Sequence, residues 1–184
     1  KSSICEQLGV SKFPVAAALS RLKEEGLVEV RPRSGSVVSR IQTREVLQAA
    51  FIRRALEIET VWTLAPIVTP QLIKRLERNL LYQRFAVEQK HWVEFHEFDV
   101  EFHTILLDEL AYPRVQQVLE RSRGSLDRAR WLNAPQRQHA VILQEHMQIK
   151  EELANRNSAK AADAMRIHLD AGFAQVAAYM DANP

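Results

Sequence analysis

Apolar residues near the start of the chain recur at helical spacing between residues that favour turns. A short helix is predicted over 4–8, because Ser3 can cap its start and Gly9 can end it in a left-handed conformation. Ser11 can cap a second helix, which Gly26 ends. The apolar positions of that helix lie three or four residues apart, as on one buried face: Val15, Ala18, Leu19 and Leu22.

After Gly26 the pattern changes to two short segments that alternate or are rich in β-branched residues, at 27–30 and 36–39. The link 31–35 contains a proline and a glycine, which favour a hairpin turn. A helix, a turn, a second helix and a hairpin with a basic tip form the element order of a winged helix-turn-helix domain. The first helix of such a domain is missing here.

From Thr43 onward the strand signals disappear and helix-start signals recur. Thr43, Thr69 and Ser158 are candidate caps, and prolines at 70, 113 and 135 suit the first turn of a helix. Six helices with short connections are therefore predicted, over 45–64, from 70, and over 92–110, 113–131, 135–154 and 159–179. Short connections favour an antiparallel bundle.

The change of pattern at 41–43 divides this mainly α chain in two. We predict a partial winged helix-turn-helix domain over 1–41 and an all-α antiparallel helical-bundle domain over 42–184. The charge follows this division, because residues 1–40 carry seven lysines and arginines against four acidic residues, and the rest carries eighteen against nineteen. A basic surface confined to the N-terminal domain indicates a polyanionic partner.

Composition excludes several classes of protein. Of the 184 residues, 46% are hydrophobic and 26% are charged, as in a globular protein, and no apolar run approaches the roughly 20 residues that span a membrane. The single cysteine, Cys5, cannot form a disulfide within the chain, which favours the reducing cytoplasm. Only five glycines occur, without a GxGxxG or GxxxxGK[ST] motif, so a nucleotide-dependent enzyme is not expected.

The element order and the charge together predict binding to double-stranded DNA. The second helix of a helix-turn-helix lies in the major groove, and a basic hairpin without acidic residues at its tip suits phosphates or the minor groove. We expect a homodimer on a pseudo-palindromic operator, because one recognition helix reads only a few base pairs. The expected DNA contacts are Ser11, Lys12, Phe13, Arg21, Arg31, Arg33 and Gly35.

All six histidines lie in the C-terminal domain, and some have the spacing of metal ligands. Asp99 and His103 are four residues apart and share one face of a helix. His146 and His168 are equally far from the turn of a predicted helical hairpin, which places both imidazoles at one height. Three imidazoles and one carboxylate suit Zn²⁺, with Ni²⁺, Co²⁺ or Mn²⁺ as alternatives. Such histidines could instead bind an acid by hydrogen bonds.

Residues 7–28 resemble the DNA-binding domain of GntR-family transcription regulators, and the rest resembles the FCD effector domain of the fatty-acid-regulator-like subfamily, in its shorter six-helix form. The motifs that carry the second resemblance are Arg53-x-x-x-Glu57, Phe98-Asp99-x-x-Phe102-His103, Glu145-His146-x-x-Ile149 and Ala164-Met165-x-x-His168-Leu169. The resemblance implies that the metal ligands are Asp99, His103, His146 and His168. It also implies an organic or sugar acid as effector, with Arg53 and Arg130 as its expected partners.

The recognition helix departs from the family pattern V-S-R-x-P-V-R-E-A-L. Ala16 stands in place of an arginine that contacts DNA in the family, Ala17 in place of an acidic residue, and Lys12 in place of a second arginine. Loss of a guanine-reading arginine costs about 1–3 kcal/mol at one base pair. The resemblance therefore leaves the operator sequence undefined.

The leading interpretation is a DNA-binding transcriptional repressor whose bundle holds a divalent metal and a small carboxylate. A metal-dependent enzyme and a pure metal sensor are the alternatives. An enzyme would need a general base beside the ion, and Glu145 is expected to point about 100° away from His146 around its helix. Arg53 could likewise pair with Glu57 instead of an effector. The remaining histidines show no evident partner in the sequence: His91, His96 and His139.

Overall fold

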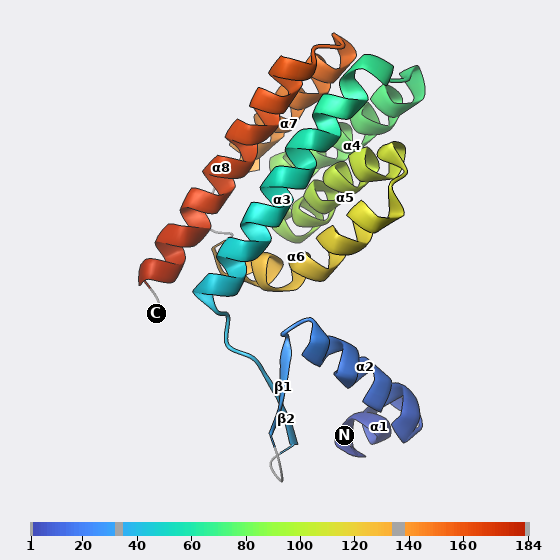
Figure 1. Cartoon of the computed structure of the whole chain (residues 1–184), viewed down its shortest axis with the longest axis vertical. Helices are drawn as coiled ribbons and strands as arrows, with labels where there is room; N and C mark the ends of the chain where they lie inside the picture. Colours follow the sequence, from blue (N-terminus) through green and yellow to red (C-terminus); the bar gives the residue numbers. More distant parts are fainter. Residues whose placement is uncertain (1, 32–34, 134–138, 183–184) are drawn as a thin grey trace.

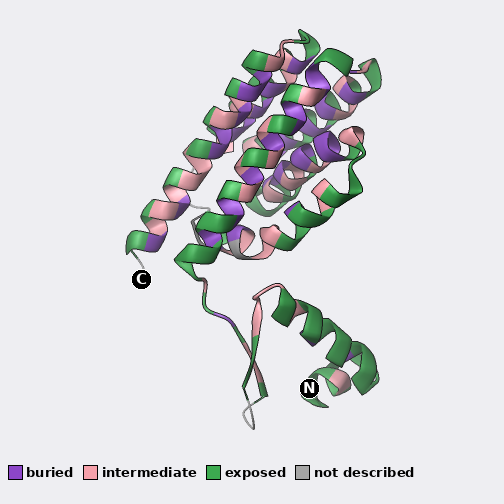
Figure 2. Ribbon diagram, in the orientation of Figure 1, coloured by how far each residue is buried: buried purple, intermediate pink, exposed green. Residues whose placement is uncertain are grey.

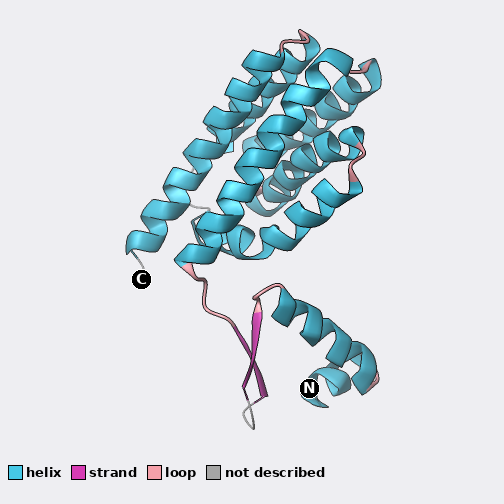
Figure 3. Ribbon diagram, viewed as in Figure 1, coloured by secondary structure: helices cyan, strands magenta, loops and turns pink. Residues whose placement is uncertain are grey.

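The computed structural model describes residues 2–31, 35–133 and 139–182, except for the side chains of residues 125, 130, 132 and 133. Within this part of the chain, a small N-terminal part is joined by an extended segment to a larger helical bundle (Figure 1). Strands occur among the described residues only in the N-terminal part (Figure 3). The predicted combination of a winged helix-turn-helix with an all-helical domain is confirmed.

The N-terminal part contains two helices and an antiparallel hairpin, with Val28 opposite Val38. Gly9 and Gly26 follow the two helices with φ of +63° and +73°, so Gly9 has the predicted left-handed conformation and Gly26 ends its helix as predicted. The elements are α1 (Ser2–Leu8), α2 (Lys12–Glu24), β1 (Val28–Arg31) and β2 (Gly35–Val38).

The bundle contains six α-helices and one 3₁₀ turn among the described residues, in agreement with the predicted count. Helix α3 lies along α8 and also packs on α6, and α4 packs on α5 (Figure 1). The elements are α3 (Thr43–Leu64), η1 (Ala65–Ile67), α4 (Pro70–Gln89), α5 (Trp92–Leu110), α6 (Pro113–Asn133), α7 (His139–Ala154) and α8 (Ser158–Ala182). The predicted start at Pro135 lies outside the described residues. None of the described helices is both long and apolar enough to cross a membrane.

The helix starts differ in detail from the predicted caps. Thr69 caps α4 as predicted, since its Oγ1 accepts a hydrogen bond from the N–H of Leu72 at 3.1 Å. Ser158 is instead the first residue of α8, where Asn157 Oδ1 accepts from the N–H of Lys160 at 3.1 Å. Three other predicted caps lie inside their helices or make no capping hydrogen bond: Ser3, Thr43 and Ser11.

The inner faces of the bundle helices form the core, shown in purple in Figure 2. Its largest fully buried side chains include Phe95, Phe102, Leu72 and Met165. Burial of a polar group costs free energy unless it finds a partner. The core nevertheless contains a set of buried polar and charged side chains, most of them contributed by α3, α4 and α5: Arg53, Glu57, Thr60, Asn79, Gln83, Asp99, His103, His146 and His168.

Candidate metal centre

Four of the buried polar side chains converge at one point in the bundle. Asp99 and His103 come from α5, His146 from α7 and His168 from α8, and one ligand atom of each lies within 4.8 Å of the others. The Nε2 atom of His168 lies 3.3 Å from Nε2 of His146 and 3.2 Å from Nε2 of His103. The Asp99 Oδ1 atom lies 3.7 Å from His146 Nε2. The structure therefore brings together all four residues that the sequence singled out.

The α7–α8 hairpin explains how two of these residues meet. Arg156 takes the left-handed conformation at φ +57°, and its N–H donates to the carbonyl of Leu153 at 2.9 Å, which closes the turn. His146 and His168 lie about equally far from this turn on antiparallel helices, and both imidazoles reach the same level of the core. The predicted alignment of the two rings agrees with the observed distance.

Each of the three imidazoles meets an oxygen atom through its other ring nitrogen, Nδ1. The contacts are His103 with Glu57 Oε2 at 2.6 Å, His146 with Gln83 Oε1 at 2.9 Å and His168 with Glu145 Oε2 at 2.8 Å. A neutral imidazole carries one proton, and an acceptor at Nδ1 keeps the proton there. The three Nε2 lone pairs then face one another, which is the usual arrangement of histidines around a metal ion.

The amide of Gln83 is oriented by a chain of hydrogen bonds that begins at a carboxylate. Asn79 Nδ2 donates to Glu101 Oε2 at 2.8 Å and to the carbonyl of Phe98 at 3.0 Å. The Asn79 Oδ1 atom therefore faces Gln83 and accepts from its Nε2 at 2.7 Å. This orientation leaves Gln83 Oε1 to accept from the Nδ1–H of His146.

The spacing of the nitrogen atoms fits a shared ion. Ligand atoms that each lie about 2.0–2.1 Å from one ion are about 3.0–3.4 Å apart at neighbouring corners of the coordination polyhedron. The two Nε2 distances of 3.2 and 3.3 Å fall in this range. Three neutral nitrogens and a carboxylate oxygen form a donor set that suits a divalent ion of intermediate softness. The residues present therefore fit a metal ion.

An ion pair supports the centre from α3. Arg53 Nε donates to Glu57 Oε1 at 2.6 Å, and both side chains are buried. Burial by itself would raise the pKa of Glu57, but the attraction of the Arg53 guanidinium and of His103 holds that pKa well below its usual range. Burial lowers the pKa of His103, which favours the neutral ring. Arg53 thus pairs with Glu57, the arrangement that the sequence left open.

Sequence reasoning missed the contributions of Gln83 and Glu145. Gln83 and Asn79 lie four apart on the apolar face of α4, and a pair of amides on such a face is the signal that could have revealed them. Glu145 was expected to point away from His146. It reaches His168 on the neighbouring helix instead, which no spacing within α7 could show.

The other three histidines take no part in the cluster, and each has an aromatic partner that the sequence did not reveal. The distances between ring centroids are 6.3 Å for His91 and Phe85, 4.8 Å for His96 and Trp131, and 4.5 Å for His139 and Trp92. These partners were not evident in the sequence because they lie on other turns and helices, while His91 and His139 stand at the starts of α5 and α7.

Most of the residues expected to contact DNA are exposed on α2 and the hairpin. Lys12, Phe13 and Arg21 are exposed on α2, Phe13 to 83%, and Arg31 lies at the end of β1. Arg31 Nη2 lies 3.4 Å from Glu29 Oε2. The expectation that the hairpin arginines have no acidic neighbour is therefore wrong for Arg31. Gly35 begins β2 with φ +93°. Arg33 lies outside the described residues, as does the side chain of Arg130.

Residues 48–171 match the family described as FCD domain, and residues 1–38 match the family described as bacterial regulatory proteins, gntR family. The chain is 30% identical to the HTH-type transcriptional repressor RspR of Escherichia coli K12 over 92% of this chain and 75% of that protein. It is 32% identical to an uncharacterized HTH-type transcriptional regulator of Streptomyces ambofaciens, over 94% and 73% respectively.

Two solved structures have a similar fold. E. coli McbR/YncC aligns with a TM-score of 0.84 at 19% identity and covers 99% of this chain and 86% of its own. A putative GntR transcriptional regulator from Rhodococcus sp. RHA1 aligns with a TM-score of 0.77 at 22% identity, over 96% and 84%. These likenesses concern the fold alone.

The contribution of the buried ion pair to stability can be tested with two neighbouring arginines. Arg53 forms a buried pair with Glu57, and Arg54 forms an exposed pair with Asp170. Arg53→Ala leaves Glu57 buried without its guanidinium partner, and we expect a loss of about 3–5 kcal/mol in the free energy of unfolding. Arg54→Ala removes only an exposed pair with Asp170, at 2.7 Å, and should change stability little. Chemical denaturation of both variants measures the difference. Equal losses would contradict the supporting role of the Arg53–Glu57 pair.

Proposed function

The chain belongs to the GntR family of bacterial transcription regulators and carries an FCD domain, and from this we propose that it is a metal-containing repressor controlled by a small carboxylate. The observation that carries the proposal is the convergence of three Nε2 atoms whose rings are each anchored at Nδ1. Its relatives are transcription regulators rather than enzymes, so the metal-dependent enzyme considered from the sequence is set aside.

Asp99, His103, His146 and His168 would hold the ion. Zn²⁺ is the first choice, since three imidazoles and a carboxylate are common ligands for it, and Ni²⁺, Co²⁺ or Mn²⁺ would accept the same set. When bound, the ion would supply a Lewis-acidic position for an oxygen of the effector. The contacts at Nδ1 from Glu57, Gln83 and Glu145 would keep the three rings aimed at it.

We assign the effector to the organic or sugar acids. Arg53 donates to Glu57 through Nε only, and its two terminal Nη groups remain the part of the side chain suited to a carboxylate. Arg130 stays a second proposed partner. A carboxylate that bridges the ion and an arginine would bind to the effector domain without touching the DNA-binding part.

Helix α2 would enter the major groove with Lys12, Phe13 and Arg21, and Ser11 would meet a phosphate at its start. The hairpin would follow the DNA backbone through Arg31, Arg33 and Gly35. Because α2 carries alanines at 16 and 17, it has few side chains able to read bases directly. We therefore expect phosphate contacts and shape to supply much of the affinity.

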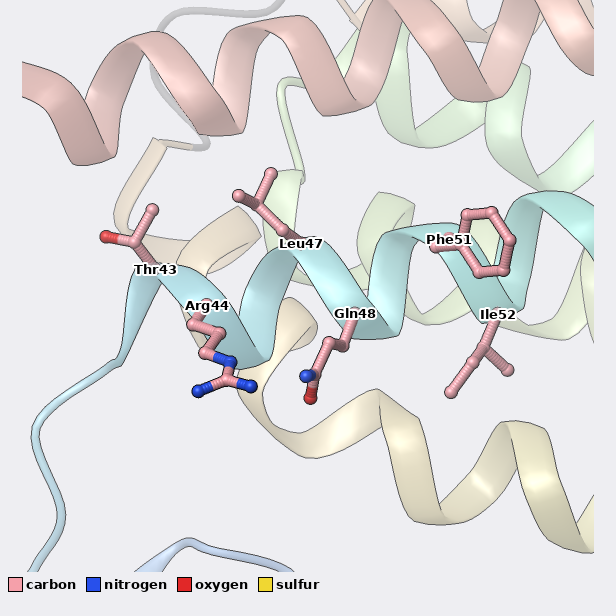
Figure 4. Close-up of a pocket in the computed structure, with 6 residues that line it drawn as sticks. All are labelled: Thr43, Arg44, Leu47, Gln48, Phe51 and Ile52. Atoms are coloured by element: carbon pink, nitrogen blue, oxygen red, sulfur yellow. The ribbon is translucent and has the colours of Figure 1, made fainter.

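A homodimer belongs to the proposal, since two recognition helices must face two half-sites. The outer face of α3 suits a second copy of the chain, because Leu47 and Phe51 are 54% and 74% exposed there. Both side chains project from the same side of the helix (Figure 4), and they line a pocket of about 660 Å³ with Thr43, Arg44, Gln48 and Ile52.

Metal content tests the centre directly. We expect purified protein to hold about one divalent ion per chain, and His146→Ala or His168→Ala to remove most of it, because each loses one of four ligands. His91→Ala and His139→Ala are matched controls outside the cluster and should keep the ion. Elemental analysis measures all five proteins. If wild type and His146→Ala contain the same negligible metal while a carboxylate still binds, the histidines are hydrogen-bonding groups for the effector.

DNA binding can be tested without knowledge of the operator. Lys12→Ala should weaken binding to a mixed-sequence duplex and reduce the slope of log affinity against log salt by about one unit, because one phosphate contact is lost. Lys74→Ala removes an exposed cation of the same charge on α4 and should leave both quantities unchanged. Fluorescence anisotropy over a salt series measures them. An unchanged slope for Lys12→Ala would remove Lys12 from the interface.

Dimer formation through α3 can be tested by placing a charge on its outer face. Phe51→Glu should raise the dissociation constant of the dimer at least about tenfold, because a carboxylate would be buried against the partner. Leu81→Glu is the matched control, since Leu81 is 60% exposed on α4. Sedimentation velocity over a concentration series compares the two. If both substitutions weaken the dimer equally, or if neither does, the dimer contact does not involve the outer face of α3.

A further inference from the structure

We infer that helix α6 couples the metal centre to the DNA-binding part by holding the base of its hairpin. The inference rests on the proposed function, because it concerns how the state of that centre reaches α2 and the hairpin. In Figure 1, α6 lies on the side of the bundle nearest the start of β1, and its Gly124 lies against the side chain of Leu27. One side of α6 contacts α5 at Thr104, the neighbour of the proposed ligand His103. Another side contacts the base of the hairpin at Ser39.

The hairpin base is formed by Leu27 and Ser39, which flank the two strands. The N–H of Ser39 donates to the carbonyl of Leu27 at 3.0 Å, which joins the two residues across the end of the hairpin. The Arg128 Nη2 atom on α6 donates to the carbonyl of the buried Ser39 at 2.6 Å. Because Gly124 lies one helical turn before Arg128, the same side of α6 also meets Leu27.

Gly124 of α6 lies directly against the side chain of Leu27. It lies inside α6 without a positive φ, where alanine would stabilise the helix better. A Cβ atom at this position would lie 2.9 Å from Cδ2 and 3.1 Å from Cδ1 of Leu27. A Cβ atom at position 124 would therefore require the Leu27 side chain to shift. Helix α6 and the hairpin base fit each other through this position.

The residue before Gly124 reaches toward the metal centre. The Arg123 Nη2 atom donates to Thr104 Oγ1 at 3.2 Å, and Thr104 is the neighbour of His103 in α5. The Thr104 hydroxyl in turn donates to the carbonyl of Val100 at 2.9 Å, so the contact is made to a fixed group on α5. Consecutive residues of one helix thus contact the element that carries a proposed ligand and the base of the hairpin.

The remainder of α6 is anchored in a small core of its own. Leu126 and Ala129 are buried against the start of α3 and the end of α8, in a cluster with Val46, Ala49, Val176 and Met180. A packed interior changes its arrangement in steps rather than by gradual deformation. A change at His103 that shifts α5 against α6 would therefore alter the contacts of α6 with Leu27 and Ser39.

Hydrogen exchange of the full chain with and without Zn²⁺ tests this coupling. In wild type, removal of the ion with a chelator should speed exchange at 24–31 and 35–42 at least about threefold, since the hairpin base is released. In Gly124→Ala, exchange there should already be fast with the ion bound and respond less than about 1.5-fold to its removal. Alanine favours helix, so this variant should keep its fold.

Arg128→Leu is a second variant that removes the donor to Ser39 and should behave like Gly124→Ala. Glu120→Ala, at an exposed position of α6, is the matched control and should respond like wild type. Elemental analysis should show the same metal content in all four proteins, which separates the coupling from the centre itself.

The outcomes can be told apart. If the ion binds but wild-type exchange at the hairpin base does not change on its removal, the coupling is wrong and the proposed metal centre stands. A wild-type response in Gly124→Ala and Arg128→Leu would likewise overturn the role of α6. If no protein holds the ion, the proposed centre fails, and the coupling to it fails with it.

Discussion

The bundle is organised around three buried imidazoles, in which the Nε2 atom of His168 lies 3.2 and 3.3 Å from those of His103 and His146. Such an arrangement requires that the rings cannot turn away, and every ring is fixed through Nδ1 by an oxygen from a different helix. Glu57 comes from α3, Gln83 from α4 and Glu145 from α7. Because the site is buried, the hydrogen bonds of His146 to Gln83 and of His168 to Glu145 also satisfy polar groups that would otherwise destabilise the core. These contacts join five helices, because the rings come from α5, α7 and α8 and the oxygen atoms from α3, α4 and α7.

Much of the fold was predictable because its signals are local. Prolines at 70 and 113 mark helix starts, Gly9 and Gly26 mark helix ends, and the change to β-branched residues marks the hairpin. The convergence at the centre was also predictable, since Asp99 and His103 share a helical face and the α7–α8 hairpin sets the level of the other two histidines. These inferences need only the geometry of one helix or of one turn.

The supporting contacts were not predictable, because they depend on which helices become neighbours. Glu145 points away from His146 as its spacing requires, yet it reaches His168 on α8. The Asn79–Gln83 pair can orient a ring only after α4 has packed on α5. The contact of Leu27 with Gly124 likewise forms only when the hairpin lies against α6. The predicted cap at Ser158 was displaced by one residue, because the neighbouring Asn157 accepts from the free N–H of Lys160.

A buried centre is a useful place for a signal because it has contacts with many elements and little freedom to adjust. A ligand that binds at an exposed site can be accommodated by side chains alone. A ligand at a centre held by α3, α4, α5, α7 and α8 must displace at least one of them or stabilise their present arrangement. Binding energy is thereby converted into a preference between arrangements of the bundle, and only differential affinity for those arrangements can shift the equilibrium. In the function that we propose, the rigidity that would make the centre specific for an ion is also what would let the DNA-binding part respond to it.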